Sequence, residues 1–568
     1  MQIFFPRAWD LLFWATIIFP FLTGGIWWKD PSFLIELSQI NLQVITLGFL
    51  GLLMEWKSPG SISRTSSIRS LQAVWLRWRK ELETRPHRSL WAATIILSFF
   101  WAATAISRHR GFETSNADMG IFTNGIWNFT QGNGFISSMK SGANLLTDHQ
   151  SPLFMLFGPI FWLVPIPETL LAMQSFGLLA GGVATYWLAR QYLPRGHAAI
   201  DWIPIAYWFF FPTRNANRFD FHPEVMMLPL FLWAVVGLQS MHTRGRIAGA
   251  FAFLLALGAK ESAGPVAVGI SLAWLAGAAP LPARKFTRFF SLAALPASVG
   301  LFFFNTTIVP GLFGKKYTYE AVYAHLGGRT SQIILAPFRD PILFLQALTT
   351  GGRVKLFLAS LAPLMLLPLL NPRAFLASVP GYLMILLTLG SHRISLAYHS
   401  SIEFSTGLFS ALPGAILFLE KWKPAFAFQQ PRTIAIAAIF LFGTYGRSDL
   451  FYLRSYPLTA HQKWVRAEVF PCLTQESFSV PDAYTPHLSL RPWVHFLPIL
   501  EKPENSGNFV SCVMTDESQP LAQEQMDLVA RHMNLVGYQE IFSCHGVKIF
   551  ESSRGKPQCL SCRPRCQN

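Results

Sequence analysis

The stretch RFDFHPEVMMLPLFLWAVVGL (Arg218–Leu238) places four titratable side chains directly before an apolar run. The run after Pro223 is typical of a helix that enters a membrane. Charged groups at a membrane helix are costly and usually serve a function. The stretch therefore predicts a membrane fold with a polar site at the end of a helix, and the four side chains are Arg218, Asp220, His222 and Glu224.

The composition extends this interpretation to the whole chain. Of the 568 residues, 51% are hydrophobic and 13% are charged, with 50 Phe and 19 Trp. A soluble chain carries about twice that charged fraction. The formal net charge of +16 is attributed to basic cytoplasmic loops, so no nucleic-acid partner is expected. We predict an all-α polytopic membrane protein.

Lysine and arginine gather in short segments, which the positive-inside rule assigns to the cytoplasm. The most basic is 57–89, and the others hold Arg190 with Arg195, Arg244 with Arg246, Arg284 with Lys285 and Arg288, and Lys421 with Lys423. Alternation between these loops predicts about thirteen transmembrane helices. They lie near residues 9–28, 33–54, 90–107, 168–190, 199–212, 223–240, 247–260, 263–280, 289–309, 354–370, 374–390, 404–420 and 432–446.

This topology places the N-terminus inside and the C-terminus outside, and it divides the chain into four parts. Two additional N-terminal helices (1–56) precede the basic cytoplasmic segment (57–89). A transmembrane core (90–446) carries a long outer loop (108–150), and an extracytoplasmic soluble domain (447–568) follows. Loops of this length usually serve a function.

One short apolar stretch, SPLFMLFGPIFWLVP (151–165), does not fit the alternation. Counting it as a span would place Arg190 and Arg195 outside and reverse the later basic loops. We therefore predict an interfacial or re-entrant helix on the outer face. A true span is the alternative.

The cysteines give a separate indication of where the tail lies. All six, at positions 472, 512, 544, 559, 562 and 566, fall in the tail. Thiols confined to one soluble segment indicate disulfides in an oxidising compartment. A zinc site in CLSCRPRC (559–566) is the alternative, although it contains no histidine at finger-like spacing.

The tail also has the pattern of a small soluble α/β domain. SFSV, NFVSCVM, YQEIFS and VKIFES are typical of short strands. QPLAQEQMDLVARHMNLVG is typical of an amphipathic helix that ends at Gly537.

Titratable side chains that adjoin the apolar runs gather in four loops. The predicted topology places all four loops outside, so we predict one polar site assembled from several loops. The long loop carries Asp118 and the pair Asp148–His149. The other three carry Asp220, His222 and Glu224; Lys260 and Glu261; and His392, Arg393, Tyr398 and His399.

Several of these groups also have a purely structural interpretation. Asp118 suits the N-cap of a helix that starts at Met119, and Asp148–His149 could cap the interfacial helix. Lys260 and Glu261 could neutralise each other at a helix end. His392 and Arg393 could contact lipid headgroups.

The cluster Asp220-Phe-His222-Pro-Glu224 is harder to explain as structure alone. It offers carboxylate and imidazole ligands within a short stretch, and Pro223 would begin the next helix. His222 and Glu224 are therefore candidate ligands of a divalent metal (Mg or Mn), with hydrogen-bonded structure as the alternative.

Several motifs in order resemble a prokaryotic membrane-protein family known as domain of unknown function 2079. They are NADMGIFTNGIWNFTQGNGFISS, TDHQSPLFMLFGPIFWLVP, FDFHPEVMMLP, LGAKESAGPVAVG and PHLSLRPWVHFLP. The resemblance runs from about Leu90 to Glu551. The family is similar in organisation to the C-type (GT-C) membrane glycosyltransferases, which use polyprenyl-phosphate donors.

This resemblance implies a GT-C-like core and assigns residues to roles. Asp118 matches the catalytic acid of the first outer loop, and Asp220 matches the acid of the second. His149 with Ser151-Pro152 resembles the His-Pro-Pro before the interfacial helix. Two departures are visible: a single Asp118 stands where paired acids are usual, and two extra N-terminal spans shift the loop numbering.

The favoured hypothesis is a sugar transferase at the extracytoplasmic face of a bacterial inner membrane. Such an enzyme needs a base for the acceptor hydroxyl and positive charge for the leaving phosphate. The partners would be membrane lipid and a polyprenyl-phosphate sugar donor. A transporter or flippase and a non-catalytic binding protein are the alternatives. The assigned residues are Asp118 and Asp220 as catalytic, His149, Lys260, Glu261, Arg393 and His399 as substrate-binding, and His222 and Glu224 as metal ligands.

Overall fold

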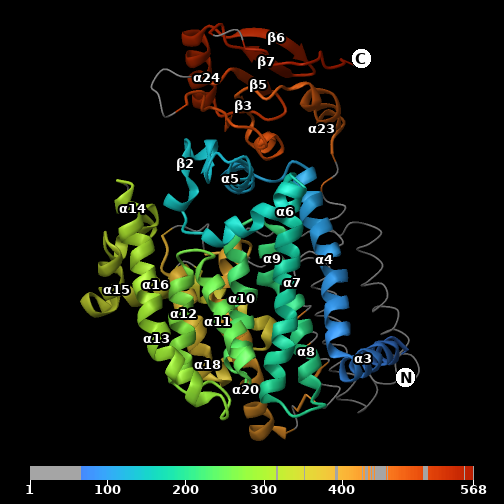
Figure 1. The fold of residues 1–568 in the computed structure, drawn as a ribbon, viewed down its shortest axis with the longest axis vertical. Coiled ribbons are helices and arrows are strands. Elements are labelled where there is room, and N and C mark those ends of the chain that lie inside the picture. Colours follow the sequence, from blue (N-terminus) through green and yellow to red (C-terminus); the bar gives the residue numbers. More distant parts are fainter. Residues whose placement is uncertain are drawn as a thin grey trace. The chain divides into compact units, whose positions relative to one another are not determined.

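The structure is a computed structural model that describes residues 66–314, 317–350, 352–389, 394–424, 460–502, 509–554 and 557–566, with single positions between 427 and 459. The chain forms two compact units (Figure 1). Unit 1 comprises Met1–Thr104, Ser175–Phe219 and Glu224–Ser455, and unit 2 comprises Ala105–Gln174, Asp220–Pro223 and Tyr456–Asn568. The predicted helices at 9–28 and 33–54 and Arg393 lie outside the described residues, as does most of 432–446.

Unit 1 is built from helices. Two of its helices, α4 and α7, continue into unit 2. The helices are α3 (Ser66–Thr84), α4 (Pro86–Arg110), α7 (Pro167–Tyr192), α8 (Ala198–Trp208), α9 (Phe211–Arg218), η6 (Pro223–Met226), α10 (Met227–Leu238), α11 (Thr243–Leu257), α12 (Ala263–Leu275), α13 (Arg284–Phe303), η7 (Phe304–Ile308), α14 (Val309–Leu312), η8 (Thr318–Leu326), α15 (Thr330–Arg339), α16 (Pro341–Thr349), α17 (Arg353–Leu361), η9 (Ala362–Leu364), η10 (Leu367–Leu370), α18 (Pro372–Phe375), η11 (Leu376–Ser378), α19 (Val379–Leu386), η12 (His399–Ser401) and α20 (Ile402–Trp422).

The predicted spans between residues 90 and 420 each coincide with a helix or a series of short helices. Within the described ranges, three helices are long and apolar enough to cross a membrane: Pro86–Arg110, Arg284–Leu312 and His399–Trp422. A bent pair, Pro341–Thr349 with Arg353–Leu364, would make a fourth. The predicted number of about thirteen spans is therefore not confirmed. Breaks shorten many of the others; α8, for example, ends before Pro212, which opens α9.

Small residues let the helices of unit 1 approach closely. A Cβ atom on Gly237 of α10 would lie 2.5 Å from the Cα of Gly249 on α11. On α20, a Cβ atom on Gly407 would lie 2.2 Å from the backbone nitrogen of Ser378. Close backbone approach at glycine is a common way to pack helices in a membrane. Alanine at either glycine would require these helices to move apart.

Unit 2 combines the long loop with the C-terminal domain. Its loop elements are η2 (Asn116–Gly120), α5 (Ile121–Thr130), the antiparallel pair β1 (Ile136–Ser137) and β2 (Ala143–Asn144), η3 (Ser138–Lys140), η4 (Leu145–Thr147), η5 (Pro152–Phe157) and α6 (Gly158–Leu163). Its C-terminal elements are α23 (Ala460–Trp464), η14 (Val465–Val469), η15 (Phe470–Cys472), β3 (Phe478–Val480), η16 (Asp482–Leu488), β4 (Val494–Phe496), β5 (Cys512–Asp516), α24 (Gln523–Val536), β6 (Gln539–Cys544) and β7 (Val547–Glu551).

The C-terminal strands form one mixed sheet in the order β4-β3-β5-β7-β6. Strand β3 pairs in parallel with β4 and β5, and β7 pairs antiparallel with β5 and β6. Four strands and α24 confirm the predicted α/β domain, and Gly537 ends α24 with φ of +75°. Strand β4 was not predicted, because it has only three residues and lies between Pro492 and Pro498.

A buried asparagine links the long loop to the C-terminal domain inside unit 2 by hydrogen bonds. The amide of Asn124 on α5 donates to the carbonyl oxygens of Ser489 at 3.0 Å and Arg491 at 2.8 Å. Its oxygen accepts the backbone N–H of Ser138 at 2.9 Å. The Ser138 hydroxyl in turn donates to the carbonyl of Val494 at 2.8 Å. An amide suits this position because it donates and accepts at once.

All six cysteines are paired, which confirms the predicted oxidation and leaves no thiolate for zinc. The bonds are Cys472–Cys562, Cys512–Cys559 and Cys544–Cys566. They close loops of 90, 47 and 22 residues. Disulfides that close loops of these lengths contribute roughly 3–5 kcal/mol each to stability.

We expect no alkylatable thiol in the native protein and six after reduction under denaturing conditions. Mass analysis after iodoacetamide treatment measures both numbers. We also expect reduction alone to lower the unfolding temperature of unit 2, since it removes cross-links between distant segments. Six reactive thiols in untreated protein would contradict the pairing and place the tail in a reducing compartment.

The apolar stretch at 151–165 forms only short helices. Pro152–Leu163 is helical, which is too short to cross the hydrocarbon core. Its exposed apolar side chains include Trp162 and Leu163. A short helix with an exposed apolar side is typical of a segment that lies in the membrane interface.

We expect a cysteine introduced at Ile166, directly after this segment, to react with a membrane-impermeant maleimide added to the outside of intact cells. The six native cysteines are in disulfides, so the introduced thiol is the reactive one. The measurement is the mass of labelled protein with and without prior permeabilisation. Labelling that requires permeabilisation would make the segment a span.

His495 on β4 makes the C-terminal domain sensitive to acid. Burial lowers the pKa of His495 to about 4, and Lys502 contributes to the same direction. An unfolded histidine has a pKa of about 6.5, so the unfolded state binds more protons between these values. The free energy of unfolding should therefore fall as the pH drops from 6.5 to 4, by roughly 3 kcal/mol over that range.

Thermal unfolding of the full-length protein across this pH range tests the prediction. We expect His495→Phe to reduce the pH dependence, because phenylalanine binds no proton; the rest remains, since burial also lowers the pKa of His487. A His495→Phe protein with an unchanged pH dependence would rule out this residue as the source.

Candidate functional site

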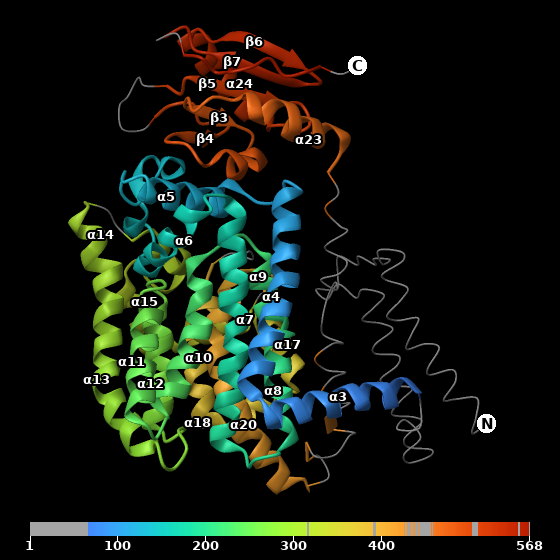
Figure 2. The same ribbon diagram turned by 45° about the vertical axis from the view of Figure 1, so that its right-hand side comes forward.

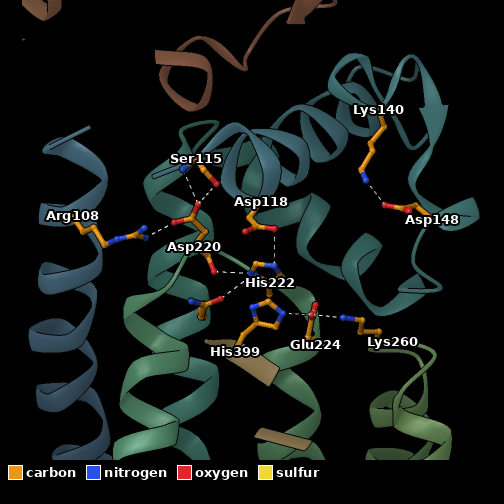
Figure 3. A network of polar contacts seen from close by, with 11 residues as sticks. Arg108, Ser115, Asp118, Lys140, Asp148, Asp220, His222, Glu224, Lys260 and His399 are labelled. Atoms are coloured by element: carbon orange, nitrogen blue, oxygen red, sulfur yellow. Dashed lines mark hydrogen bonds and ion pairs between the residues drawn. The ribbon is translucent and has the colours of Figure 1, made fainter. Parts of the chain in front are cut away.

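The stretch that follows α9 carries Asp220, His222 and Glu224. Pro223 begins η6, which leads into α10, as its position before the apolar run predicted. Asp220 and His222 belong to unit 2, and Glu224 belongs to unit 1. Figure 3 shows the contacts of these side chains.

Asp220 is buried and fully engaged within unit 2. Its Oδ1 accepts a hydrogen bond from the Arg108 guanidinium at the end of α4, in an ion pair. Its Oδ2 accepts the backbone N–H of Ser115 at 2.8 Å and the Ser115 hydroxyl at 3.1 Å (Figure 3). A buried carboxylate with these partners is fixed in place. Asp220 therefore anchors the start of the long loop to the end of α4.

His222 lies between the two predicted acids. Its backbone N–H donates to Gln174 Oε1 at 3.0 Å, and its ring contacts the Phe122 ring with centroids 5.4 Å apart. Ring atom Nδ1 lies 2.9 Å from the carbonyl oxygen of Asp220. Ring atom Nε2 lies 3.1 Å from Asp118 Oδ1 (Figure 3).

The two contacts of the His222 ring determine where protons can lie. A carbonyl oxygen only accepts, so Nδ1 must carry a proton. Nε2 faces a carboxylate, so a hydrogen bond there requires a second proton, either on the ring or on Asp118. The His222–Asp118 contact therefore holds one proton between an imidazole and a carboxylate. Such a pair can accept or release a proton during a reaction.

Asp118 is the more accessible member of the pair. Its side chain is 28% exposed, whereas that of His222 is 6% exposed. It lies inside the π-helical turn η2, and α5 starts after Gly120 without a side-chain cap. Asp118 therefore does not cap α5.

Glu224 is the centre of a second group, which lies in unit 1. Lys260 Nζ, in the turn between α11 and α12, donates to Glu224 Oε1 at 2.7 Å. His399 Nε2, at the start of η12, lies 3.1 Å from the same oxygen. Burial lowers the pKa of Lys260, but the carboxylates of Glu224, Glu261 and Glu403 outweigh burial and raise it overall. Lys260 is therefore a fixed ammonium group.

Glu261 does not simply neutralise Lys260, its neighbour in sequence. Its Oε1 accepts a hydrogen bond from the Tyr317 hydroxyl at 2.8 Å, and Glu261 is buried. Lys260 instead donates to Glu224, 36 positions away in sequence. The predicted substrate-binding pair is thus divided between two partners within unit 1.

Two predicted residues remain, His149 and Arg393. The backbone N–H of His149 donates to the carbonyl of Leu145 in the turn after η4. Its neighbour Asp148 forms an ion pair with Lys140 at 2.8 Å. Arg393 lies outside the described residues.

Three residues that hold the site were not among the predicted set. Arg108 and Ser115 bind Asp220, and Gln174 binds the backbone of His222. Arg108 adjoins the predicted end of a span, and its partner Asp220 lies 112 positions away in sequence, so no local pattern pairs them. Ser115 and Gln174 carry no sequence signal for this role.

The fold is similar to that of solved structures. ArnT from Cupriavidus metallidurans bound to undecaprenyl phosphate matches with a TM-score of 0.50 and 9% identity, over 83% of this chain and 98% of that chain. ArnT from the same organism in the apo state matches with a TM-score of 0.47 and 10% identity, over 81% and 98%. At this identity the likeness concerns the fold alone. It confirms, for the fold, the predicted resemblance to the C-type glycosyltransferases.

The sequence comparisons place the chain in a family of membrane proteins. Comparison with the curated proteins finds no match. The family model described as Predicted membrane protein (DUF2079) matches residues 108–442, which contain Asp118, Asp220, His222, Lys260 and His399. Together with the long apolar helices, this match makes the chain an integral membrane protein. The chain belongs to the DUF2079 family of predicted membrane proteins.

Proposed function

We propose that this protein transfers a sugar from a polyprenyl-phosphate donor to an acceptor hydroxyl at the extracytoplasmic face of the membrane. The observation that carries the proposal is the contact between Asp118 and His222, which gives a partly exposed carboxylate a buried proton partner. The likeness in fold to ArnT, whose structure holds undecaprenyl phosphate, supports the donor class.

In the proposed reaction, Asp118 removes the proton of the acceptor hydroxyl. The acceptor oxygen forms a bond to the anomeric carbon of the sugar, and the bond from that carbon to the phosphate oxygen breaks. The polyprenyl phosphate leaves with the electron pair of that bond. A base positioned by neighbouring groups typically contributes about 10²–10⁴-fold to the rate of such a step.

Lys260 and His399 are assigned to the phosphate of the donor. Both lie at Glu224 in unit 1, and Lys260 remains positively charged. Positive charge near the departing phosphate stabilises the negative charge that develops there. In the chain, only Pro223 separates Glu224 from His222. His149, Glu261 and Arg393 keep their predicted substrate-binding roles as part of this proposal.

Asp220 has a positioning role in this proposal. Arg108 and Ser115 occupy both of its carboxylate oxygens. A carboxylate held in this way orients the loop that carries Asp118, rather than accepting the substrate proton itself. It also places its backbone carbonyl on His222 Nδ1.

A divalent metal such as Mg or Mn stays a prediction. His222 and Glu224 offer suitable donor atoms, but each already has a protein partner: Asp118 for the imidazole and Lys260 for the carboxylate. The Lys260 ammonium already supplies positive charge at Glu224. When bound, a metal would add Lewis-acid stabilisation of the phosphate. Dialysis against a chelator followed by the transfer assay tests this, and unchanged turnover would remove the metal from the proposal.

A non-catalytic binding protein would require the acidic clusters of unit 2 to lie apart. His222 instead contacts the side chain of Asp118 and the backbone of Asp220. The transporter alternative would place its charged groups near the membrane midplane on broken helices. Lys260 lies in a turn between two helices, so neither alternative gains support here.

The test uses full-length protein in lipid nanodiscs with a panel of polyprenyl-phosphate hexoses and pentoses. We expect at least one donor to release free polyprenyl phosphate when a glycan or lipid acceptor is present. Mass spectrometry of the lipid fraction measures the release. If no donor is consumed and undecaprenyl phosphate does not bind the protein, the proposal is rejected.

A further inference from the structure

Helix α3 combines a basic side with exposed apolar residues. Its sequence is SSIRSLQAVWLRWRKELET (Ser66–Thr84). Trp78 and Leu82 share the side that faces unit 1, where Leu82 is buried. The exposed side carries Arg69, Arg77 and Lys80, flanked by the exposed apolar residues Val74 and Leu76. This pattern is typical of a helix that lies in the plane of a membrane surface.

The C-terminal half of α3 is fixed to unit 1. Arg79 Nε donates to Asp201 Oδ2 at 2.8 Å, and Arg79 Nη2 donates to the carbonyl of Gly196 at 2.7 Å. The Trp78 ring meets the Trp208 ring edge-on with centroids 6.4 Å apart. These contacts hold the helix in a defined direction, so its exposed residues form a fixed surface.

That surface lies at one end of the membrane-spanning helix α4. Figure 2 shows α3 running across the N-terminal end of α4. Arg108 lies at the opposite end of α4, which has 25 residues and is long enough to cross the hydrocarbon core. Helix α3 therefore lies at the level of a headgroup layer, at the other end of α4 from Arg108.

The surface is positively charged and retains exposed apolar area. From Ser66 to Arg88 the chain has six basic residues and two acidic ones. The side chains of Val74 and Leu76 are 64% and 61% exposed. A lipid headgroup layer offers both partners at once, since anionic phosphates attract the cations and the acyl boundary takes up the apolar side chains.

We propose that α3 docks on anionic phospholipid headgroups at this membrane face, through Arg69, Arg77 and Lys80. Charge complementarity selects the occupant, because a zwitterionic surface would gain little from these cations. This inference does not depend on the transferase proposal. It assigns the basic segment a specific lipid partner.

The test places a fluorescent reporter on α3. The six native cysteines are paired, so Val74→Cys provides a unique thiol for a dye whose emission depends on polarity. Full-length labelled protein is placed in nanodiscs of phosphatidylcholine alone or with phosphatidylglycerol, each containing a lipid-borne quencher. We expect blue-shifted, quenched emission with phosphatidylglycerol and aqueous-like emission without it.

A triple variant removes three exposed charges and leaves the Arg79 contacts in place: Arg69→Gln, Arg77→Gln and Lys80→Gln. We expect the triple variant to lower the equilibrium constant for docking on phosphatidylglycerol by roughly a hundredfold. Leu535→Cys, an exposed apolar position on α24 of the C-terminal domain, serves as the control reporter and should not respond to lipid charge. Equal quenching in both lipids, or no loss in the triple variant, would overturn the proposal. A blue shift of the reporter emission on addition of RNA or an acidic peptide, but not with phosphatidylglycerol, would overturn it as well.

Discussion

Replacing Asp118 by asparagine is expected to lower turnover by about 10²–10⁴-fold, the usual contribution of a general base. Asparagine keeps the shape of the side chain and still accepts a hydrogen bond from His222, but it cannot take up a proton near neutral pH. The loop should keep its structure, since Asp118 does not cap α5. The measurement is the release of polyprenyl phosphate per enzyme under saturating donor.

Asp148→Asn is the matched control for this change. Asp148 lies in the same loop, is partly exposed, and forms its ion pair with Lys140 rather than with a histidine. We expect turnover within about twofold of wild type, because surface ion pairs contribute little. His222→Gln should reduce turnover and change its pH dependence, whereas a purely structural histidine would not alter the pH profile. A fully active Asp118→Asn protein would show that another residue is the base.

Replacing Arg108 by glutamine is expected to destabilise unit 2 by about 3–5 kcal/mol, because it leaves a buried carboxylate without its charged partner. Asp220 is buried, and Arg108 supplies its ion pair. The Ser115 hydrogen bonds remain but carry no full positive charge. Hydrogen exchange of the 112–130 region and thermal unfolding of the full-length protein measure the loss.

Arg110→Gln gives a close comparison on the same helix. Arg110 pairs with Glu168 at 3.1 Å, but its side chain is 54% exposed. Exposed pairs contribute about 0–1 kcal/mol, so this variant should be nearly as stable as wild type. Adding Asp220→Asn to Arg108→Gln should recover part of the loss, since the uncharged amide costs less to bury. Equal stability of the Arg108→Gln and Arg110→Gln proteins would contradict the assignment of a buried ion pair.

Local pattern was sufficient for much of the C-terminal domain. The alternation of apolar and polar residues around Cys512 and Ile549 predicted the central strands, and Gly537 predicted the end of α24. Because all six cysteines lie in the tail, the sequence also predicted that they form disulfides. These features depend on short-range periodicity and turn chemistry, which a single sequence carries.

Pairing between distant residues could not be predicted in the same way. Arg108 and Asp220 are 112 positions apart, and Lys260 and Glu224 are 36 apart. The sequence placed the charged groups in one set of loops but could not say which carboxylate takes which cation. Lys260 next to Glu261 suggested that pair as one alternative, whereas the hydrogen bond of Lys260 goes to Glu224. Tertiary packing determines these pairs, because it brings together segments that are far apart in the sequence.

The number of spans was difficult to predict for a related reason. Hydropathy recognises apolar length, but α9 continues the path of α8 with buried polar residues such as Arg214 and Asn215. Buried polar groups are tolerated where helices pack on one another, so a polar helix can belong to the bundle. Length and composition alone therefore separate α4, α13 and α20 from the rest.

The hydrogen bonds of Asn124 have a consequence for the biogenesis of the protein. Asn124 is bonded to Ser489 and Arg491, which lie 365 and 367 positions further along the chain. At translation rates of about 5–20 residues per second, those partners emerge on the order of tens of seconds after the loop. The loop that carries Asp118 is therefore completed only after the tail has been synthesised, has reached its compartment and has folded. The newly made chain enters the membrane before these hydrogen bonds can form, and acquires them as one of the last events of its biogenesis.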